Sequence, residues 1–265
     1  MNFSWARARA VFWKDWVDLK KNRGMIWSML ALPAVLVVVP AGVVWTYATR
    51  PDAVDVGVIA QYYGGPHRGV DAARFMVERV LTDWFSLYLI MPIFVPILVS
   101  SHAVAGEKER RTLEPLLASP VTTMELLVGK SLASLAPAMI ICSLAYVGLC
   151  LTVDLASYGS LHALILPNTM WSFGVFVIAP LFAFFGNGIA VLISARVGDS
   201  RLAQQLSGLF VLPMVGLAVG QFANFLKADV AYYGVIGVVV LLLDGALLLA
   251  ARRLFDRERL MSKWG

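Results

Sequence analysis

Residues 25–48 read MIWSMLALPAVLVVVPAGVVWTYA and contain no Lys, Arg, Asp or Glu. A helix of about 20 such residues is long enough to cross the roughly 30 Å hydrocarbon core of a bilayer. Five further stretches are equally apolar, and only the last contains a charged side chain, Asp244: residues 84–105, 131–151, 169–195, 202–226 and 230–251. The chain therefore predicts an all-α integral membrane fold with six transmembrane helices.

The composition of the 265-residue chain agrees with a membrane protein. Hydrophobic residues make up 59 % and charged residues 15 %, and the mean hydropathy is +0.75. A soluble domain averages about 25 % charged residues, so a water-soluble fold is excluded. The residues before the first span are polar or amphipathic and lack a small-residue cleavage site. We therefore expect the first span to be retained and not removed as a signal peptide.

The distribution of Lys and Arg predicts the orientation. Of these 22 residues, 17 lie in the segments 1–24, 106–130, 196–201 and 252–263, which alternate spans place on one side of the membrane. Basic residues concentrate on the cytoplasmic side, so both termini are expected in the cytoplasm of a bacterial inner membrane. Contact with anionic membrane lipid then accounts for the net charge of +5, and no nucleic-acid partner is needed.

The segments outside the spans differ in character. Residues 1–24 place Trp5, Phe12 and Trp16 at helical spacing among basic side chains, which predicts an amphipathic elbow helix in the membrane interface. A generic basic anchor would show the same pattern. Residues 49–83 form a small outer loop region with a short amphipathic helix before the second span, and residues 252–265 form a basic cytoplasmic tail.

The cytoplasmic loop 106–130 has a pattern of its own. Pro120 ends a short predicted helix, and Thr122 and Glu125 have the spacing of a capping box at the start of the third span. The predicted helix between spans two and three is amphipathic because apolar residues recur at i, i+3, i+4 and i+8: Leu113, Leu116, Leu117 and Val121.

Residues 107–130, EKERRTLEPLLASPVTTMELLVGK, resemble the signature of the ABC type-2 permease family. Its elements are an acidic and basic cluster, Thr-Leu-Glu, a Leu-rich turn, Pro-Val, Glu-Leu and Gly-Lys. Arg111 departs from the family, which usually has Gly there, and this puts the shape or docking angle of the helix start in question. The residues that carry the resemblance are Glu107, Lys108, Glu109, Thr112, Leu113, Glu114, Pro120, Glu125, Leu126, Gly129 and Lys130.

The resemblance implies the permease subunit of an ATP-driven exporter. Such a subunit pairs with a second permease copy, here expected to give a homodimer, and with two copies of a separate ABC ATPase subunit. The segment 107–121 would be the coupling helix, because a coupling element must project from the membrane and offer mixed charges and an apolar edge. The residues expected to contact the ATPase are Glu107, Glu109, Arg110, Thr112, Leu113, Glu114, Leu116, Leu117 and Pro120.

The chain is expected to be non-catalytic and to bind no cofactor, with ATP and Mg held by the partner ATPase. Its Gly-Lys-Ser at residues 129–131 is no phosphate-binding loop, because that motif needs a further Gly where Met124 stands. The three histidines, His67, His102 and His162, have no zinc-type spacing.

Two polar residues are predicted at membrane depth. Asp244 precedes Arg252 by eight residues and Asn187 precedes Arg196 by nine, so they lie at similar depth and a hydrogen bond between them is allowed. An intramembrane carboxylate costs about 2.5–3.5 kcal/mol, and protonation of Asp244 would avoid that cost. Asp244 is a substrate-path or ion-coupling group, part of an inter-helix clamp, or a group near the inner interface. Two alternative functions stay open: a secondary transporter driven by an ion gradient through Asp244, and a non-transporting membrane assembly subunit.

Overall fold

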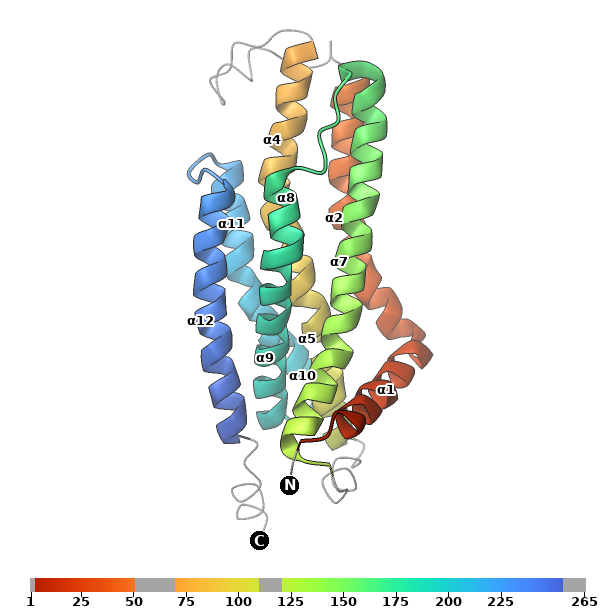
Figure 1. The fold of residues 1–265 in the computed structure, drawn as a ribbon, viewed down its shortest axis with the longest axis vertical. Coiled ribbons are helices and arrows are strands. Elements are labelled where there is room, and N and C mark those ends of the chain that lie inside the picture. The colour runs from red at the N-terminus through yellow and green to blue at the C-terminus, as the bar shows by residue number, and fades with distance from the viewer. Residues whose placement is uncertain (1–2, 51–69, 110–120, 255–265) are drawn as a thin grey trace.

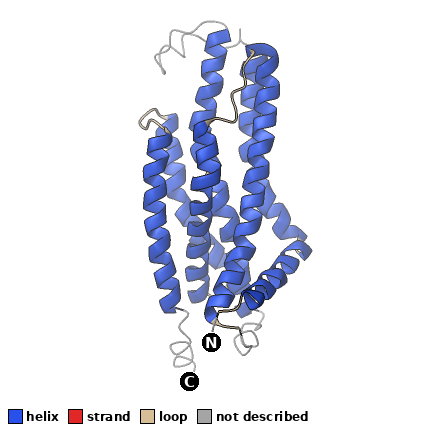
Figure 2. Ribbon diagram, viewed as in Figure 1, coloured by secondary structure: helices blue, strands red, loops and turns tan. Residues whose placement is uncertain are grey.

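The computed structural model describes residues 3–50, 70–109 and 121–254. Within these ranges the chain consists of helices and short loops, with no strand (Figure 1, Figure 2). The elements in chain order are α1 (Trp5–Lys21), α2 (Arg23–Thr49), α4 (Val70–Tyr88), α5 (Ile90–Glu109), α7 (Thr123–Leu161), α8 (Thr169–Phe173), the π-helical η2 (Gly174–Ile178), α9 (Ala179–Arg196), α10 (Ser200–Gly208), the 3-10 turn η3 (Leu209–Val211), α11 (Leu212–Phe222) and α12 (Val230–Leu254).

Six helical stretches in the described ranges are long and apolar enough to cross a membrane, which confirms the predicted fold class. The first, third and sixth are α2, α7 and α12. The other three are composite: α4 with α5, α8 through η2 to α9, and α10 through η3 to α11. The π-helical turn η2 ends two residues before Pro180, whose ring cannot fit a regular α-helical ladder.

The second span is longer than its apolar core suggested. The sequence placed its start at Trp84, whereas helix α4 begins at Val70 and continues through a break at Leu89 into α5. The added turns are amphipathic. Their apolar side chains Val77 and Leu81 are fully buried against neighbouring helices, so protein rather than lipid covers this face.

Helices α4 and α5 form the centre of the bundle. Helix α5 packs against α9, α7 and α10, and α4 packs against α2 and α11. Aromatic rings fill the centre near the break: Phe85 stacks edge-to-face on Trp171 and Tyr233, with ring centroids 4.8 and 4.7 Å apart. Such arrangements are favoured by the quadrupoles of the rings, so they fix the relative positions of three spans.

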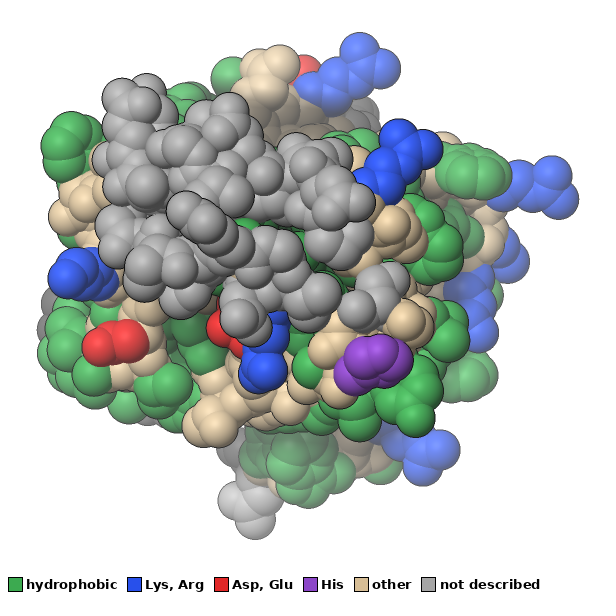
Figure 3. Space-filling view, turned by 90° about the horizontal axis from the view of Figure 1, so that it is seen from above, with side chains coloured by type: hydrophobic (Ala, Val, Ile, Leu, Met, Phe, Trp, Pro, Cys, Tyr) green, Lys and Arg blue, Asp and Glu red, His purple; other side chains and the backbone are tan. Residues whose placement is uncertain are grey.

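Both described chain ends lie at one end of the bundle, here called the terminal end (Figure 1). Helix α1 runs obliquely there, packs on α7, and turns at Asn22 into α2 (Figure 1). In the view from the opposite end, hydrophobic side chains make up much of the described surface (Figure 3). Along the sides of the bundle, large apolar side chains such as Trp45, Leu144 and Leu242 are exposed, as expected where lipid is the solvent.

Candidate functional site

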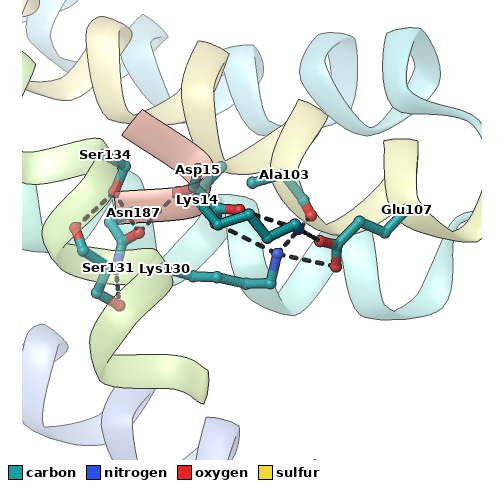
Figure 4. A network of polar contacts seen from close by, with 9 residues as sticks. Lys14, Asp15, Ala103, Glu107, Lys130, Ser131, Ser134 and Asn187 are labelled. Carbon is teal, nitrogen blue, oxygen red and sulfur yellow. Dashed lines mark hydrogen bonds and ion pairs between the residues drawn. The ribbon is translucent and has the colours of Figure 1, made fainter. Parts of the chain in front are cut away.

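The segment predicted to couple to an ATPase is bounded by two helices that meet α1. Helix α5 ends at Glu109, α7 begins at Thr123, and residues 110–120 lie outside the described residues. A cluster of charged side chains joins the three helices at this point (Figure 4). It consists of Lys14 and Asp15 from α1, Glu107 from α5 and Lys130 from α7.

Lys130 is the centre of this cluster. Its Nζ lies 2.9 Å from Oε2 of Glu107 and 3.4 Å from Oδ2 of Asp15, and it donates a hydrogen bond of 2.8 Å to the carbonyl oxygen of Ala103. Lys14 pairs with Glu107 and lies 3.2 Å from Oδ1 of Asp15. The two ammonium groups balance the two carboxylates, so the cluster is neutral as a whole.

Burial makes the pairing necessary. The side chains of Lys130, Asp15 and Glu107 are only 5 %, 8 % and 11 % exposed, whereas Lys14 is 45 % exposed. A buried charge without a partner is expensive, so each of these groups depends on the others. Burial acts to lower the pKa of Lys14, but the hydrogen bond to Glu107 and the charge of Asp15 outweigh it and raise that pKa above its ordinary value.

A second contact fixes the start of α7 to α1. The predicted capping box is confirmed: Thr122 N donates to Oε2 of Glu125 at 2.7 Å, and Glu125 N donates to Oγ1 of Thr122 at 3.3 Å. The same carboxylate accepts a hydrogen bond from Ser4 N at 2.6 Å and forms an ion pair with Arg7 at 3.0 Å. Glu125 therefore caps its own helix and holds the first turn of α1.

Gly129 explains how α1 can approach α7 so closely. A Cβ atom at this position would lie 2.6 Å from the carbonyl oxygen of Ala8 and 2.7 Å from Cβ of Val11. Only glycine leaves room for that crossing. The Gly-Lys pair at the entrance of the third span thus has two structural roles, since Gly129 admits α1 and Lys130 binds it.

A polar cluster without net charge lies deeper in the bundle (Figure 4). Asn187 of α9 accepts hydrogen bonds at Oδ1 from Ser100 of α5 at 2.7 Å and from Ser134 of α7 at 2.8 Å. Its Nδ2 donates to Oγ of Ser131 at 2.9 Å. The side chain of Asn187 is buried, and its bonds tie three spans together.

The hydrogen bond between Asp244 and Asn187 that their depth allowed is absent. The two residues line the same groove between α7, α9 and α12, but both carboxylate oxygens of Asp244 are buried without a hydrogen-bond partner among the described residues. Asn187 is instead engaged by the serines. Asp244 therefore lines the same groove as Asn187 but takes no part in the hydrogen bonds of the polar cluster.

Most of the residues predicted to contact an ATPase fall on the segment 110–120, outside the described residues: Arg110, Thr112, Leu113, Glu114, Leu116, Leu117 and Pro120. Glu109 is the last residue of α5, and its side chain is likewise not described. Glu107 is described, and its carboxylate is engaged inside the chain. The sequence did not identify Lys14, Asp15 and Lys130 as its partners, although a lysine opening an apolar span is a signal that a counter-charge must lie nearby.

Comparison with known families adds the decisive observation. The family model described as "ABC-2 family transporter protein" matches residues 9–244, from the middle of α1 to Asp244 in α12. The chain belongs to the ABC-2 transporter family. The family resemblance read from residues 107–130 is thereby confirmed. Among curated proteins, none matches the chain.

Membership identifies this ABC-2 protein as a membrane transport component, the permease of an ABC transporter. Families of this kind generally work with an ABC ATPase. Within the described ranges, no group of three or more His, Cys, Asp or Glu side chains is placed to hold a metal ion. At the terminal end of the ABC-2 protein, the charged side chains described above form ion pairs that join α1, α5 and α7.

Proposed function

We propose that the chain is the permease subunit of an ATP-driven exporter, which binds a separate ABC ATPase through residues 107–121. The observation that carries this proposal is the double attachment at the boundaries of that segment. Glu107 on one side and Glu125 and Lys130 on the other are all bound to α1. A segment held at both ends by one helix can transmit a displacement, because its ends cannot move independently.

The attachments suggest which parts would move together. The two boundaries belong to α5 and α7, and α1 continues directly into α2. A force applied by an ATPase to residues 110–120 would therefore reach the first three spans as one unit. Transmission of this kind needs packed elements with discrete arrangements, and the buried ion pairs are suited to keep the unit intact.

Pairing with a second copy completes the proposal. The sequence at Gly216 and Gly220 is a GxxxG motif, which favours close packing of membrane helices. A Cβ atom at Gly216 would meet nothing within 4 Å, and the neighbouring Leu212, Val215 and Val219 are exposed. Gly220 lies against Leu226, but among the described residues nothing covers Gly216, so the part of α11 around Gly216 is available to the same part of a second copy.

The place of ATP and Mg is proposed from the family, and the orientation in the membrane from the distribution of charge. We place ATP and Mg on the two ATPase subunits, since the chain is not an enzyme in this proposal. The chain lies in the inner membrane of a bacterium with both termini in the cytoplasm, in agreement with the excess of Lys and Arg in the segments on that side. The terminal end of the bundle then faces the ATPase.

The test uses the full chain with an affinity tag, expressed in its source cells and purified from membranes with its associated ATPase. The pair is reconstituted in nanodiscs, where ATP hydrolysis and substrate efflux are measured. Glu114→Lys and Leu116→Asp are expected to abolish copurification of the ATPase, because they change the polar and apolar edges of the predicted coupling helix. Leu155→Ser, at an exposed position of α7 remote from the loop, is the control.

Two outcomes would contradict the proposal. One is normal ATPase binding and efflux by both loop variants. The other is transport by the purified chain with an ion gradient and no ATPase, which would favour a secondary transporter. Loss of thermal stability in the loop variants is checked by the melting temperature of each solubilised chain.

A further inference from the structure

Asp244 occupies an unusual position in the last span. The preceding residues Leu242 and Leu243 are exposed on the outside of the bundle, as expected of a helix that faces lipid. Both carboxylate oxygens of Asp244 are buried, yet no described residue donates a hydrogen bond to them. An ionisable group at membrane depth is normally paired with another polar group. Among the described residues Asp244 has no such partner, so its carboxylate is available to a ligand.

A groove of about 300 Å³ lies in front of this carboxylate. It runs along the terminal end of the bundle between α7, α9 and α12, and the first residue of α1, Trp5, contributes to its wall. Leu132, Phe184 and Leu247 give it apolar sides. Pockets for small ligands are typically apolar and begin at about this volume, with few polar groups to orient the ligand.

The polar content of the groove selects the charge of its occupant. Asp244 is the only charged residue that lines it among those described, and Ser131 and Asn187 are already hydrogen-bonded to each other. A single cation would satisfy the carboxylate. A zwitterionic or anionic phospholipid would bring a phosphate into a groove where no described lining residue carries a positive charge, and that phosphate would lose its hydration without compensation from those residues.

We propose that this groove binds a lipophilic ammonium ion, with the ammonium group on Asp244 and the apolar part between α7, α9 and α12. Trp5 and Phe184 contribute aromatic rings to the lining beside its aliphatic residues. The site opens on the side of the bundle, so a ligand enters from the lipid. The proposed ammonium site goes beyond the proposed export function, because binding of the ammonium ion needs neither an ATPase nor a second copy of the chain.

The test is photo-crosslinking of the full chain in nanodiscs of phosphatidylcholine. The probe is dodecylammonium carrying a diazirine on its alkyl chain, and its neutral counterpart is the corresponding dodecanol. Crosslinked peptides are identified by mass spectrometry. We expect the ammonium probe to label peptides of α7, α9 and α12 that line the groove. Unlabelled dodecylammonium should displace it, whereas dodecanol should not.

Three variants locate the binding. Asp244→Asn removes the charge and should lower labelling of the groove about tenfold or more, as for loss of one partner of a buried charge pair. Leu248→Trp fills the groove but keeps the carboxylate, and it should also abolish labelling. Leu242→Trp adds the same ring at an exposed position of α12 that does not line the groove, and it should leave labelling unchanged.

Several results would overturn the proposal. Equal labelling of the groove by the ammonium and alcohol probes would show that charge is irrelevant. Undiminished labelling of Asp244→Asn would show the same for the carboxylate. Displacement of the probe by phosphatidylethanolamine in the nanodisc would show that the ligand is a lipid headgroup and not a lipophilic ammonium ion. Because no ATPase is present, none of these results bears on whether the chain is a permease.

Discussion

Lys130 Nζ lies 2.9 Å from Oε2 of Glu107, and this ion pair joins the entrance of the third span to the end of the second. The two residues stand 23 positions apart in the sequence and flank the segment that we propose to contact an ATPase. Both are also bound to α1. This ion pair therefore links the two ends of the proposed coupling segment to each other and to α1.

Lys130→Met should destabilise the chain by about 2 kcal/mol, below the about 3–5 kcal/mol typical of a broken buried pair, because Lys14 still neutralises Glu107. The measurement is thermal unfolding in detergent. Lys21→Met, which removes an exposed lysine of α1, is the control. The double variant with Glu107→Gln should recover part of the loss, since it leaves Lys14 paired with Asp15. A Lys130→Met chain as stable as the control would contradict the assignment.

Gly129→Ala should displace α1 from α7, because the added Cβ would lie 2.6 Å from the carbonyl oxygen of Ala8. Trypsin cleavage within α1 reports the displacement and is expected to become several times faster. Gly148→Ala, on the same helix, adds a methyl group where nothing lies within 4 Å and should leave cleavage unchanged. Equal cleavage of both variants would mean that α1 does not depend on this contact.

Asn187→Leu should lower the free energy of unfolding by about 1–2 kcal/mol, because three serine hydroxyls lose their hydrogen bond to Asn187 and inter-helix hydrogen bonds in membranes are individually weak. Unfolding is measured by urea titration in mixed micelles. Val177→Leu, at an exposed position of the same composite span, should have no effect. An unchanged stability of Asn187→Leu would show that the serines find other partners.

Gly216→Leu should weaken the proposed dimer, because the leucine keeps the α11 faces of two copies apart. The mass of the solubilised chain, measured by light scattering, is expected to shift from dimer to monomer. Gly234→Leu places the same side chain on α12, also in open space, and should preserve the dimer. Retention of the dimer by Gly216→Leu, or its loss in both variants, would exclude α11 as the contact.

Stability should fall at high pH through Lys14. The pKa of its ammonium group is raised from 10.5, so its contribution is complete below 10.5 and is lost as the pH rises through the higher folded value. Between about pH 9 and about pH 11.5 the melting temperature should fall more for the natural chain than for Lys14→Arg, because a guanidinium stays charged throughout. Parallel curves for the two chains would disprove a role for Lys14.

The sequence predicted the features that depend on local pattern. Runs of apolar residues located six spans, and the spacing of Thr122 and Glu125 predicted a capping box that the structure confirms. Both signals arise within a few helical turns. The family was also legible, because its signature is a continuous stretch of the chain, residues 107–130.

Features that depend on contacts between distant segments were not predictable. The pattern of residues 70–83 showed an amphipathic helix but not that protein covers its apolar face, so the start of the second span was placed at Trp84. The ion-pair partners of Glu107 are Lys14 and Lys130, and no sequence periodicity relates these two positions to Glu107. Asp244 was recognised as costly, but whether a described residue pairs with it depends on how α7, α9 and α12 pack.

The central position of α5 has a consequence for how the chain is made. Helix α5 packs against α9 and α10, which are synthesised after it, and it carries the buried Ser100 and Ser101. Until those later helices have entered the membrane, these polar groups would face lipid, where unsatisfied groups are costly. We therefore expect the N-terminal half to be less stably packed in the membrane by itself. The second span gains its remaining partners, such as Asn187 for Ser100, only when the C-terminal half is complete.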